Sequence, residues 1–400
     1  MNPDKRLIIT LKEYENIALE REEFSDDLGK ILWNRYRNQV QIEYPTPKTE
    51  YMWQLISQGW VGYIPLTNDL HLSLQPKIPL SNLFQMLEYA YNLKNFKFIQ
   101  GLMDSASLED FYERLAVILA KRILDRGKKG FYRSYLEYNE RMAYIRGRID
   151  LNNVLSKPWD SYLLCHYQDH TPDIDDNQLL AWTLYHIPRS GMCSSRSLPF
   201  ISRAYRSLMG LVSLVPKSPS DCLYRLYNRL NDDYHPMHCL CRFFLEQTGP
   251  SHQMGDHTFI PFLVDMSRLY EKFVAEWIKI NLPENFLLKT QENIQIGLEK
   301  SIEFNIDLVI YDKNTNLPLY ILDTKYKIPD SISTADLSQV VTYAEAKSCK
   351  EAILIYPTSV KDIIDERIGN IHVRTLSFCI DDDLDDAGEE FLRELFKECE

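Results

Sequence analysis

The chain has 400 residues, of which 45% are hydrophobic and 26% are charged, and its formal net charge is −12. This size and composition indicate a globular protein with two or three domains. No run approaches the roughly 18 to 20 consecutive apolar residues of a membrane-spanning helix, and the first residues lack the apolar core of a signal peptide, so we expect a cytoplasmic protein without a membrane partner.

The charge is unevenly distributed along the chain. Residues 381–400 contain ten acidic residues against Arg393 and Lys397, a charge of −8 that leaves only −4 for the rest of the chain. The segment 121–148 instead contains nine Lys or Arg residues and three acids, a local charge of +6, with five interspersed aromatic residues. Such a segment can contact the phosphates of a nucleic acid, but a solvated surface or a docking surface for a partner protein fits the same pattern.

Residues 1–150 are predicted to form a mixed β/α domain that includes this basic segment. Alternating and amphipathic patterns predict a hairpin formed by residues 60–66 and 71–77, and helices at residues 80–93 and 108–124. At the end of the basic segment, the Gly between Arg146 and Arg148 allows a bend that points the two guanidinium groups in different directions. Both arginines are candidate nucleic-acid ligands, and a turn with surface arginines is the alternative.

Residues 151–255 are predicted to be a helical region. Within it, His235, His238, Cys239 and Cys241 are of the residue types that zinc prefers, but no second pair of ligands lies at a suitable spacing. If Pro236 opens a helix here, the cysteines are ordinary core residues.

Residues 256–400 are predicted to form a mixed sheet flanked by helices, which makes the whole chain a multidomain protein of the α+β or α/β class. The order is a helix, a strand, a hairpin, a second helix and two further strands. The predicted ranges are 262–278 for the first helix, 286–296 for the strand, and 351–357 and 371–376 for the last two strands.

The hairpin at residues 305–327 is the centre of this prediction. Two strands rich in Ile, Leu, Val and Tyr are separated by a cluster of turn formers. Since strand side chains alternate between two faces, Asp323 and Lys325 share one face of the second strand. Asp307 lies on the first strand.

The loop predicts how these carboxylates are placed. If Tyr311 pairs with Leu317, Asp307 lies opposite Ile321, and Asp323 is its diagonal neighbour at roughly 7 Å. Two carboxylates at that separation, with a Lys two residues after the second, can hold a divalent cation and leave an ammonium to act on a water or a phosphate. For these residues alone, the alternative is a hairpin with charges at its exposed end.

Two flanking helices add further polar residues. The helix at 262–278 carries Glu271 at the margin of its apolar stripe, where the carboxylate can reach a shared cleft. Downstream of the hairpin, Gln339 and Tyr343 are four residues apart and lie on one helical face.

The order of helix Glu, strand Asp, strand Asp-x-Lys and helix Gln-x-x-x-Tyr resembles the PD-(D/E)xK nuclease core and its RecB-like branch. More narrowly, the segments FLVDMSRLYEKFV, FNIDLVIY and LDTKYK resemble McrC, the nuclease subunit of McrBC modification-dependent restriction systems. Other segments, from VGYIPL to YNRLNDDYHP, follow in McrC order, so the resemblance covers most of the chain. One departure is Asn305-Ile306, where the family usually has Arg-Pro before the strand Asp.

The resemblance implies a Mg²⁺-dependent DNA endonuclease subunit, with Mn²⁺ as a possible substitute. Gln339 and Tyr343 would position the DNA strand or the phosphate on the metal side, and Lys325 would orient the attacking water or stabilise the charge of the pentacovalent phosphate. The implied catalytic residues are Asp307, Asp323, Lys325 and Glu271, and the three carboxylates among them would hold the metal.

The resemblance also implies partners. The chain has no Gly-x-x-x-x-Gly-Lys-Ser/Thr segment, so GTP would be bound by another chain and not by this one. That chain would be a McrB-like AAA+ GTPase hexamer, docked on the N-terminal region, and the substrate would be double-stranded DNA with modified cytosine, as in a type IV restriction system.

Two other functions stay open. One is a non-catalytic activator or assembly factor of the ring motor with a vestigial nuclease fold, although the intact acidic set argues against decay. The other is a stand-alone RecB-like repair nuclease, which would leave the residues up to Gly249 without a role.

Overall fold

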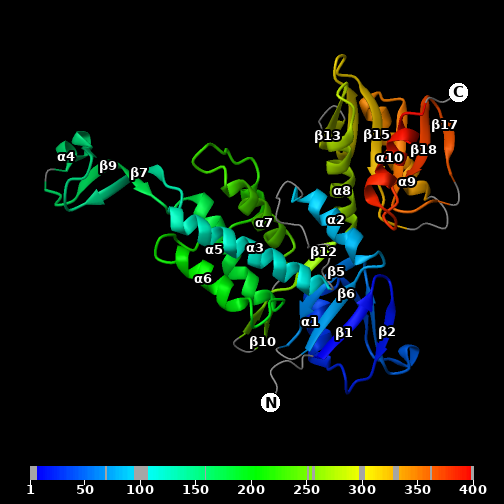
Figure 1. Cartoon of the computed structure of the whole chain (residues 1–400), viewed down its shortest axis with the longest axis horizontal. Coiled ribbons are helices and arrows are strands. Elements are labelled where there is room, and N and C mark those ends of the chain that lie inside the picture. The colour runs from blue at the N-terminus through cyan, green and yellow to red at the C-terminus, as the bar shows by residue number, and fades with distance from the viewer. Residues whose placement is uncertain are drawn as a thin grey trace. The chain divides into compact units, whose positions relative to one another are not determined.

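The computed structural model describes residues 7–67, 70–93, 107–157, 159–249, 252–254, 257–296, 302–327, 333–360 and 363–397. The chain forms two compact units (Figure 1). Unit 1 comprises Met1–Phe111 and Gly249–Glu400, and unit 2 comprises Tyr112–Thr248. This division differs from the predicted regions 1–150, 151–255 and 256–400, because the chain leaves unit 1 and later returns to it. In the described residues, no helix is long and apolar enough to cross a membrane.

Two small sheets share one hydrophobic core in the N-terminal part of unit 1. One has the strand order β1-β6-β5-β12 and the other the order β2-β4-β3. Trp53 and Leu74 from the two sheets are buried in this core together with Leu32 of α1. The antiparallel pairing of β5 with β6 confirms the first predicted hairpin, and α2 confirms the helix predicted after it. The elements are β1 (Leu7–Lys12), β2 (Asn16–Leu19), α1 (Asp26–Tyr36), β3 (Val40–Glu43), the 3-10 helix η1 (Pro47–Thr49), β4 (Trp53–Ser57), β5 (Trp60–Pro65), β6 (Leu70–Gln75), α2 (Leu80–Ala90) and β12 (Phe262–Asp265).

The predicted helix at 262–278 is wrong in its first four residues. They form β12, which pairs antiparallel with β5 and so joins the N-terminal sheet. Phe262, Leu263 and Val264 are all buried, as befits a strand covered on both faces. The helix α8 (Met266–Asn281) begins only after Asp265, whose carboxylate accepts hydrogen bonds from two backbone N–H groups of the first turn.

A six-stranded mixed sheet forms the C-terminal part of unit 1. Its order is β13-β14-β15-β16-β18-β17, with parallel pairing from β15 through β16 to β18 and antiparallel pairing elsewhere. The predicted mixed sheet with flanking helices is thereby confirmed. Val340 of α9 is buried with Val309 and Ile321 in the core of this sheet. The remaining elements of unit 1 are β10 (His252–Met254), β11 (His257–Phe259), β13 (Phe286–Ile296), β14 (Ile302–Asp312), β15 (Pro318–Thr324), α9 (Thr334–Lys347), β16 (Glu351–Tyr356), β17 (Asp365–Ile368), β18 (Ile371–Ser377) and α10 (Leu384–Leu395).

The central hairpin, β14 and β15, has a different register from the predicted one. Val309 lies opposite Ile321, and a bulge near the turn shifts the pairing. Continuing this register towards the open end places Asp307 opposite Asp323, not opposite Ile321. Two differences add up to this result: Tyr311 lies opposite Pro318 and not Leu317, and the bulge then shifts every later pair by one more residue.

In the residues of unit 2 that the structure describes, four longer helices accompany a three-stranded sheet of order β7-β9-β8. The sequence predicted a helical region at residues 151–255. This prediction is only partly correct, because β9 lies within the region and pairs with β7 and β8. The helix α3 continues past residue 124, where the sequence predicted its end, and stops before Gly130, whose φ is +90°. The elements are α3 (Leu108–Lys129), β7 (Ser134–Met142), β8 (Arg148–Ile149), α4 (Leu151–Ser156), β9 (Leu163–Thr171), α5 (Asp175–His186), the 3-10 helix η2 (Ile187–Ser190), α6 (Leu198–Leu208), the 3-10 helix η3 (Pro219–Cys222) and α7 (Tyr234–Glu246).

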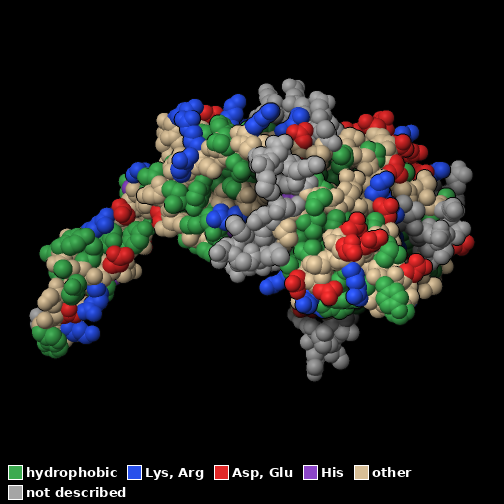
Figure 2. All heavy atoms as spheres, turned by 90° about the horizontal axis from the view of Figure 1, so that it is seen from below, with side chains coloured by type: hydrophobic (Ala, Val, Ile, Leu, Met, Phe, Trp, Pro, Cys, Tyr) green, Lys and Arg blue, Asp and Glu red, His purple; other side chains and the backbone are tan. Residues whose placement is uncertain are grey.

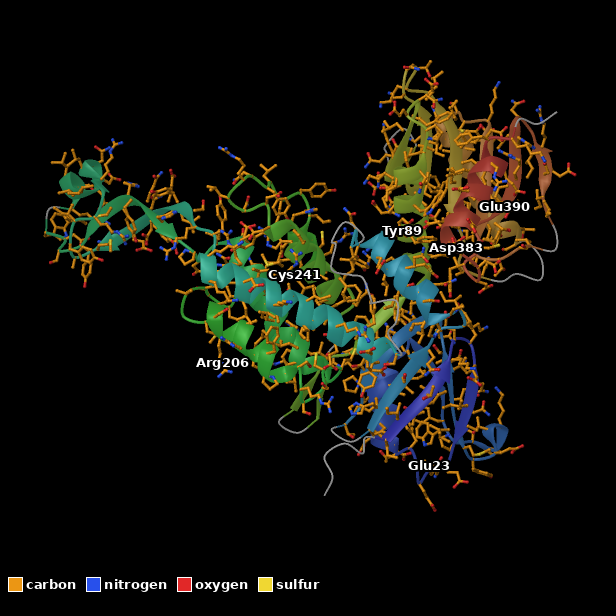
Figure 3. The ribbon with its side chains drawn as sticks, viewed as in Figure 1. Glu23, Tyr89, Arg206, Cys241, Asp383 and Glu390 are labelled. Carbon is orange, nitrogen blue, oxygen red and sulfur yellow. The ribbon has the colours of Figure 1, made fainter. Side chains whose placement is uncertain are left out.

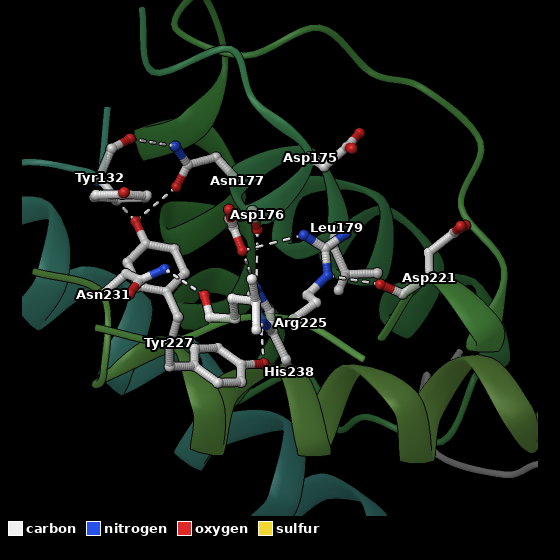
Figure 4. A network of polar contacts seen from close by, with 12 residues as sticks. Tyr132, Asp175, Asp176, Asn177, Leu179, Asp221, Arg225, Tyr227, Asn231 and His238 are labelled. Atoms are coloured by element: carbon white, nitrogen blue, oxygen red, sulfur yellow. Dashed lines mark hydrogen bonds and ion pairs between the residues drawn. The ribbon is translucent and has the colours of Figure 1, made fainter. Parts of the chain in front are cut away.

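A polar network ties α5 to α7 and to the loop before α7 (Figure 4). His238 of α7 is buried, and burial lowers its pKa to about 3, so the ring is neutral. Its Nε2 donates to the backbone oxygen of Asp176 at 3.1 Å, and its Nδ1 accepts from the hydroxyl of Tyr227 at 2.9 Å. Both ring nitrogens are thus used in the core, and among the described residues no group of three or more His, Cys, Asp or Glu side chains forms a metal site.

Candidate active site

The site is centred on the open end of the β14–β15 hairpin. Asp323 at the end of β15 is only 1% exposed, and burial, together with the charge of Asp307, raises its pKa to about 6. Burial also raises the pKa of Asp307, whose Oδ2 accepts hydrogen bonds from the backbone N–H and the hydroxyl of Thr324 at 3.3 and 3.4 Å. The sheet register therefore holds two carboxylates close together in a partly buried place.

A third carboxylate comes from the helix α8. Burial and then the charge of Asp307 raise the pKa of Glu271 to about 7. Its Oε1 accepts a hydrogen bond from the side-chain amide of Gln291 in β13. Burial is thus the main cause of the raised pKa of all three carboxyl groups, and the charge of Asp307 adds to it for Glu271 and for Asp323.

Gln291 is a site residue that the sequence analysis missed. In the β13–β14 ladder, Thr290 pairs with Leu308 and Glu292 with Ile306, so Gln291 falls opposite Asp307. Its φ is +51°, a left-handed conformation that is uncommon for a residue other than Gly. In the sequence, Gln291 is one polar residue in an exposed strand, and no pattern there reveals its backbone conformation.

Lys325 links the carboxylates to α9. Its Nζ lies 2.7 Å from Oδ2 of Asp323 and donates to Oε1 of Gln339 at 3.0 Å. The Nε2 of Gln339 in turn donates to the hydroxyl of Tyr343 at 2.7 Å. Burial opposes the charge on Lys325, but Asp323 and the neighbouring carboxylates outweigh it and raise the pKa of the ammonium. Gln339 and Tyr343, which the sequence analysis assigned to DNA, thus fix the position of Lys325.

Asp336 at the start of α9 is a second residue that the sequence analysis did not assign to the site. Its carboxylate forms an ion pair with Lys327, and its charge acts on both Asp323 and Lys325. The sequence could have indicated this residue, because Asp336 is one helical turn before Gln339 and therefore lies on the same face of the helix.

The two arginines assigned to nucleic acid lie in unit 2, whereas the carboxylates lie in unit 1. Arg146 is engaged locally: its guanidinium lies 3.0 Å from Asp169 and 4.0 Å from the ring centre of Tyr167. Gly147 has a φ of +69°, which is the bend that the sequence predicted. Arg148 is exposed at the start of β8.

The donor set of the site fits a hard divalent cation. Asp307, Asp323 and Glu271 offer only oxygen ligands. Burial raises the pKa of each carboxyl group, so a bound cation would favour the ionised forms that burial disfavours. In the described residues these side chains do not form a closed cage of three or more ligands. That arrangement suits Mg²⁺, which usually binds one or two carboxylates and completes its shell with water and substrate phosphates.

We expect the affinity for Mg²⁺ to depend steeply on pH. A metal binds the ionised carboxylates, and the pKa values of about 6 for Asp323 and about 7 for Glu271 mean that protons compete with the metal below neutral pH. Calorimetric titration of the metal-free protein should give an apparent Kd that is at least ~10-fold weaker at pH 5.5 than at pH 8. Equal affinity at the two pH values would contradict this assignment of ligands.

Comparison with known proteins adds evidence independent of this geometry. Residues 55–357 match the family model of the McrBC 5-methylcytosine restriction system component. The type IV methyl-directed restriction enzyme EcoKMcrBC of Escherichia coli (strain K12) is 24% identical over 218 residues, which are 52% of this chain and 61% of that protein. The chain thus spans less than two thirds of this relative.

A similar fold occurs in a solved assembly. A chain in the refined half-complex of Thermococcus gammatolerans McrB AAA+ hexamers with bound McrC matches with a TM-score of 0.55 and 15% sequence identity, covering 97% of this chain and 100% of that chain. At this identity the match concerns the fold alone. Since the family model spans most of the sequence, the chain belongs to the McrBC restriction-system component family.

Proposed function

We propose that this chain is the DNA-cleaving subunit of a McrBC-type restriction system and hydrolyses phosphodiester bonds with Mg²⁺. The observation that carries the proposal is the convergence of Glu271, Asp307 and Asp323 with a lysine ammonium 2.7 Å from Asp323. Such a group of carboxylates and one cation at the end of a hairpin is the arrangement expected of a PD-(D/E)xK nuclease core.

The chemistry divides between the metal and the side chains. When bound, Mg²⁺ would polarise the scissile phosphate and lower the pKa of a water molecule. Asp307, Asp323 and Glu271 would hold it by their carboxylate oxygens. Lys325 remains cationic beside Asp323, and Gln339 holds its ammonium in place, so that it can stabilise the negative charge that develops on the phosphate.

We further propose that the chain acts with a McrB-like AAA+ partner. A chain of similar fold occurs in the assembly of McrB AAA+ hexamers with bound McrC, and the E. coli relative is a type IV methyl-directed restriction enzyme. The sequence has no phosphate-binding Gly-rich loop of its own, so GTP would be hydrolysed by the partner. The proposed substrate is double-stranded DNA with modified cytosine.

Removal and return of the metal test the proposal. The intact chain, mixed with its McrB-like partner, GTP and methylated duplex DNA, should cut the DNA in Mg²⁺. Cleavage should cease once EDTA has removed the metal and resume when Mg²⁺ or Mn²⁺ is added in excess. Ca²⁺ should bind without supporting turnover. Cleavage that persists in EDTA would refute a metal-dependent mechanism.

A further inference from the structure

A basic hollow lies in unit 2, the unit that does not contain the carboxylate site. Its volume is about 760 Å³, and the C-terminal part of α3, the segment after it and the helix α6 line it. Leu124, Phe131 and Phe200 contribute apolar surface. The charged residues that line it are Lys121, Lys128, Arg133, Arg203, Arg206 and Asp125, five cations and one acid.

Most of this positive charge is uncompensated. Lys128 is paired with Asp125 at 2.8 Å. The other four cations are exposed, and none has an ion-pair partner within the described ranges. Arg206 donates from Nε to the backbone oxygen of Ser202 in its own helix, at 3.3 Å, and Figure 3 shows its side chain directed away from α6. These side chains are therefore available to an anionic ligand.

The wall of the hollow is held in place by the network of Figure 4. The side-chain amide of Asn177, which is fully buried, donates to the backbone oxygens of Tyr132 at 2.8 Å and Pro172 at 2.6 Å. Its Oδ1 accepts from the hydroxyl of Tyr234 at 2.6 Å, and that hydroxyl also accepts from the N–H of Tyr132 at 2.9 Å. Tyr132 lies between Phe131 and Arg133, which both line the hollow, and Pro172 is itself a lining residue. The network therefore fixes the shape of the hollow before any ligand binds.

The charge of the whole unit agrees with an anionic partner. Residues 112–248 contain 19 Lys or Arg and 14 Asp or Glu, a net charge of +5, so the remainder of the chain, at −12 overall, carries −17. Figure 2 shows the same contrast on one face, where Asp and Glu side chains gather mainly over the elements of unit 1. A polyanion is therefore attracted to unit 2 and repelled by most of unit 1.

We propose that this hollow binds the phosphate backbone of double-stranded DNA. The inference rests on the proposed function, which makes DNA the substrate, and it assigns a contact remote in sequence from the carboxylates. Several separate cations around an apolar floor suit a strand with regularly spaced phosphates and intervening sugars, and such contacts position a duplex without reading its sequence. An acidic segment of a partner protein is the other polyanion that the test must distinguish.

The test is duplex binding by the full-length protein in EDTA, so that no cleavage takes place. The double variant Arg203→Glu, Arg206→Glu is compared with the control Arg196→Glu, Arg229→Glu, which changes the charge of the same unit equally at exposed residues outside the hollow. Fluorescence anisotropy with a labelled duplex should show binding at least ~10-fold weaker for the hollow variant. The slope of log affinity against log salt concentration should fall by about two, one for each lost phosphate contact. The control should stay within about threefold of the intact protein.

Several outcomes overturn the proposal. One is that the hollow variant binds the duplex as tightly as the control does, and another is that the intact chain binds no duplex. A third is that the hollow variant binds the duplex normally but binds the McrB-like partner more weakly, which would assign the hollow to a protein segment. If circular dichroism shows that the charge-reversal variant is unfolded, the double variant Arg203→Gln, Arg206→Gln is tested in its place. Its duplex affinity should be about threefold weaker than that of the intact protein, with a smaller slope against salt concentration. The nuclease proposal is judged separately: loss of cleavage on metal removal supports it whatever the hollow does.

Discussion

Asp323→Asn is expected to abolish DNA cleavage while leaving the protein folded. The substitution keeps the shape of the side chain but removes a charge that would bind the metal, and a rate loss of at least ~10³-fold is expected from the loss of such a ligand. The folded state should not suffer, because Asp323 is a buried carboxylate whose pKa is raised to about 6 by burial and by the charge of Asp307. A neutral amide avoids that unfavourable burial of charge but leaves the Lys325 ammonium without its ion pair, so the two effects oppose each other and the unfolding temperature should stay close to that of the intact protein.

The matched control is Glu303→Gln. Glu303 is an exposed carboxylate on β14, the neighbouring strand, and its hydrogen bond to Gln295 lies outside the site. This variant should cut methylated DNA at the rate of the intact protein. If Asp323→Asn retained a comparable rate, the hairpin carboxylates would not be the metal site.

Lys325→Ala is expected to reduce cleavage almost as strongly, by at least ~10²-fold, while metal binding persists. The ammonium is paired with Asp323 and held by Gln339, and its loss removes a positive charge that can stabilise the transition state. Gln339→Leu should have a smaller effect, about tenfold, because it only releases the position of the ammonium.

Metal titration separates these roles. For Lys325→Ala, calorimetry should give an affinity for Mg²⁺ that is equal to or tighter than that of the intact protein, since a competing cation is gone. If metal affinity and cleavage fell by the same factor, Lys325 would be needed to maintain the metal site and would have no separate role in stabilising the transition state.

The local features of the site could be predicted from the sequence, because they depend on short-range periodicity. Alternation along the strands placed Asp323 and Lys325 on one face, and the helical spacing placed Gln339 beside Tyr343, which the hydrogen bond between them bears out. The predictions that were wrong concern elements whose structure depends on segments far away in the sequence. The strand β12 pairs with β5, about 200 residues earlier in the chain, and an apolar run of four residues does not show whether it will find such a partner.

The prediction of the hairpin register was wrong for a different reason. A bulge beside the turn has no residue type that marks it here, yet it changes which side chains lie opposite one another. As a result, the two carboxylates are direct and not diagonal neighbours. The left-handed conformation of Gln291 escaped prediction in the same way, because it is a property of the assembled site and is not favoured by the residue itself.

Cleavage and activation of the McrB-like partner should be separable, because the partner is expected to dock on the N-terminal region whereas the carboxylates converge at the β14–β15 hairpin. A chain that favours the active arrangement of a partner does so by binding free energy, and this does not require a bound metal. Loss of the carboxylate at position 323 should therefore leave the activation of a McrB-like partner intact.

Two assays run in parallel on one variant distinguish a nuclease subunit from a non-catalytic activator. Intact protein and Asp323→Asn are mixed with the McrB-like partner at matched concentrations, and GTP hydrolysis and cleavage of methylated duplex DNA are measured in the same samples. We expect equal stimulation of GTP hydrolysis by both proteins and cleavage only by the intact one. Cleavage by Asp323→Asn at the rate of the intact protein, or by neither protein while GTP hydrolysis is fully stimulated, would contradict this expectation, and the latter result would identify the chain as a non-catalytic activator.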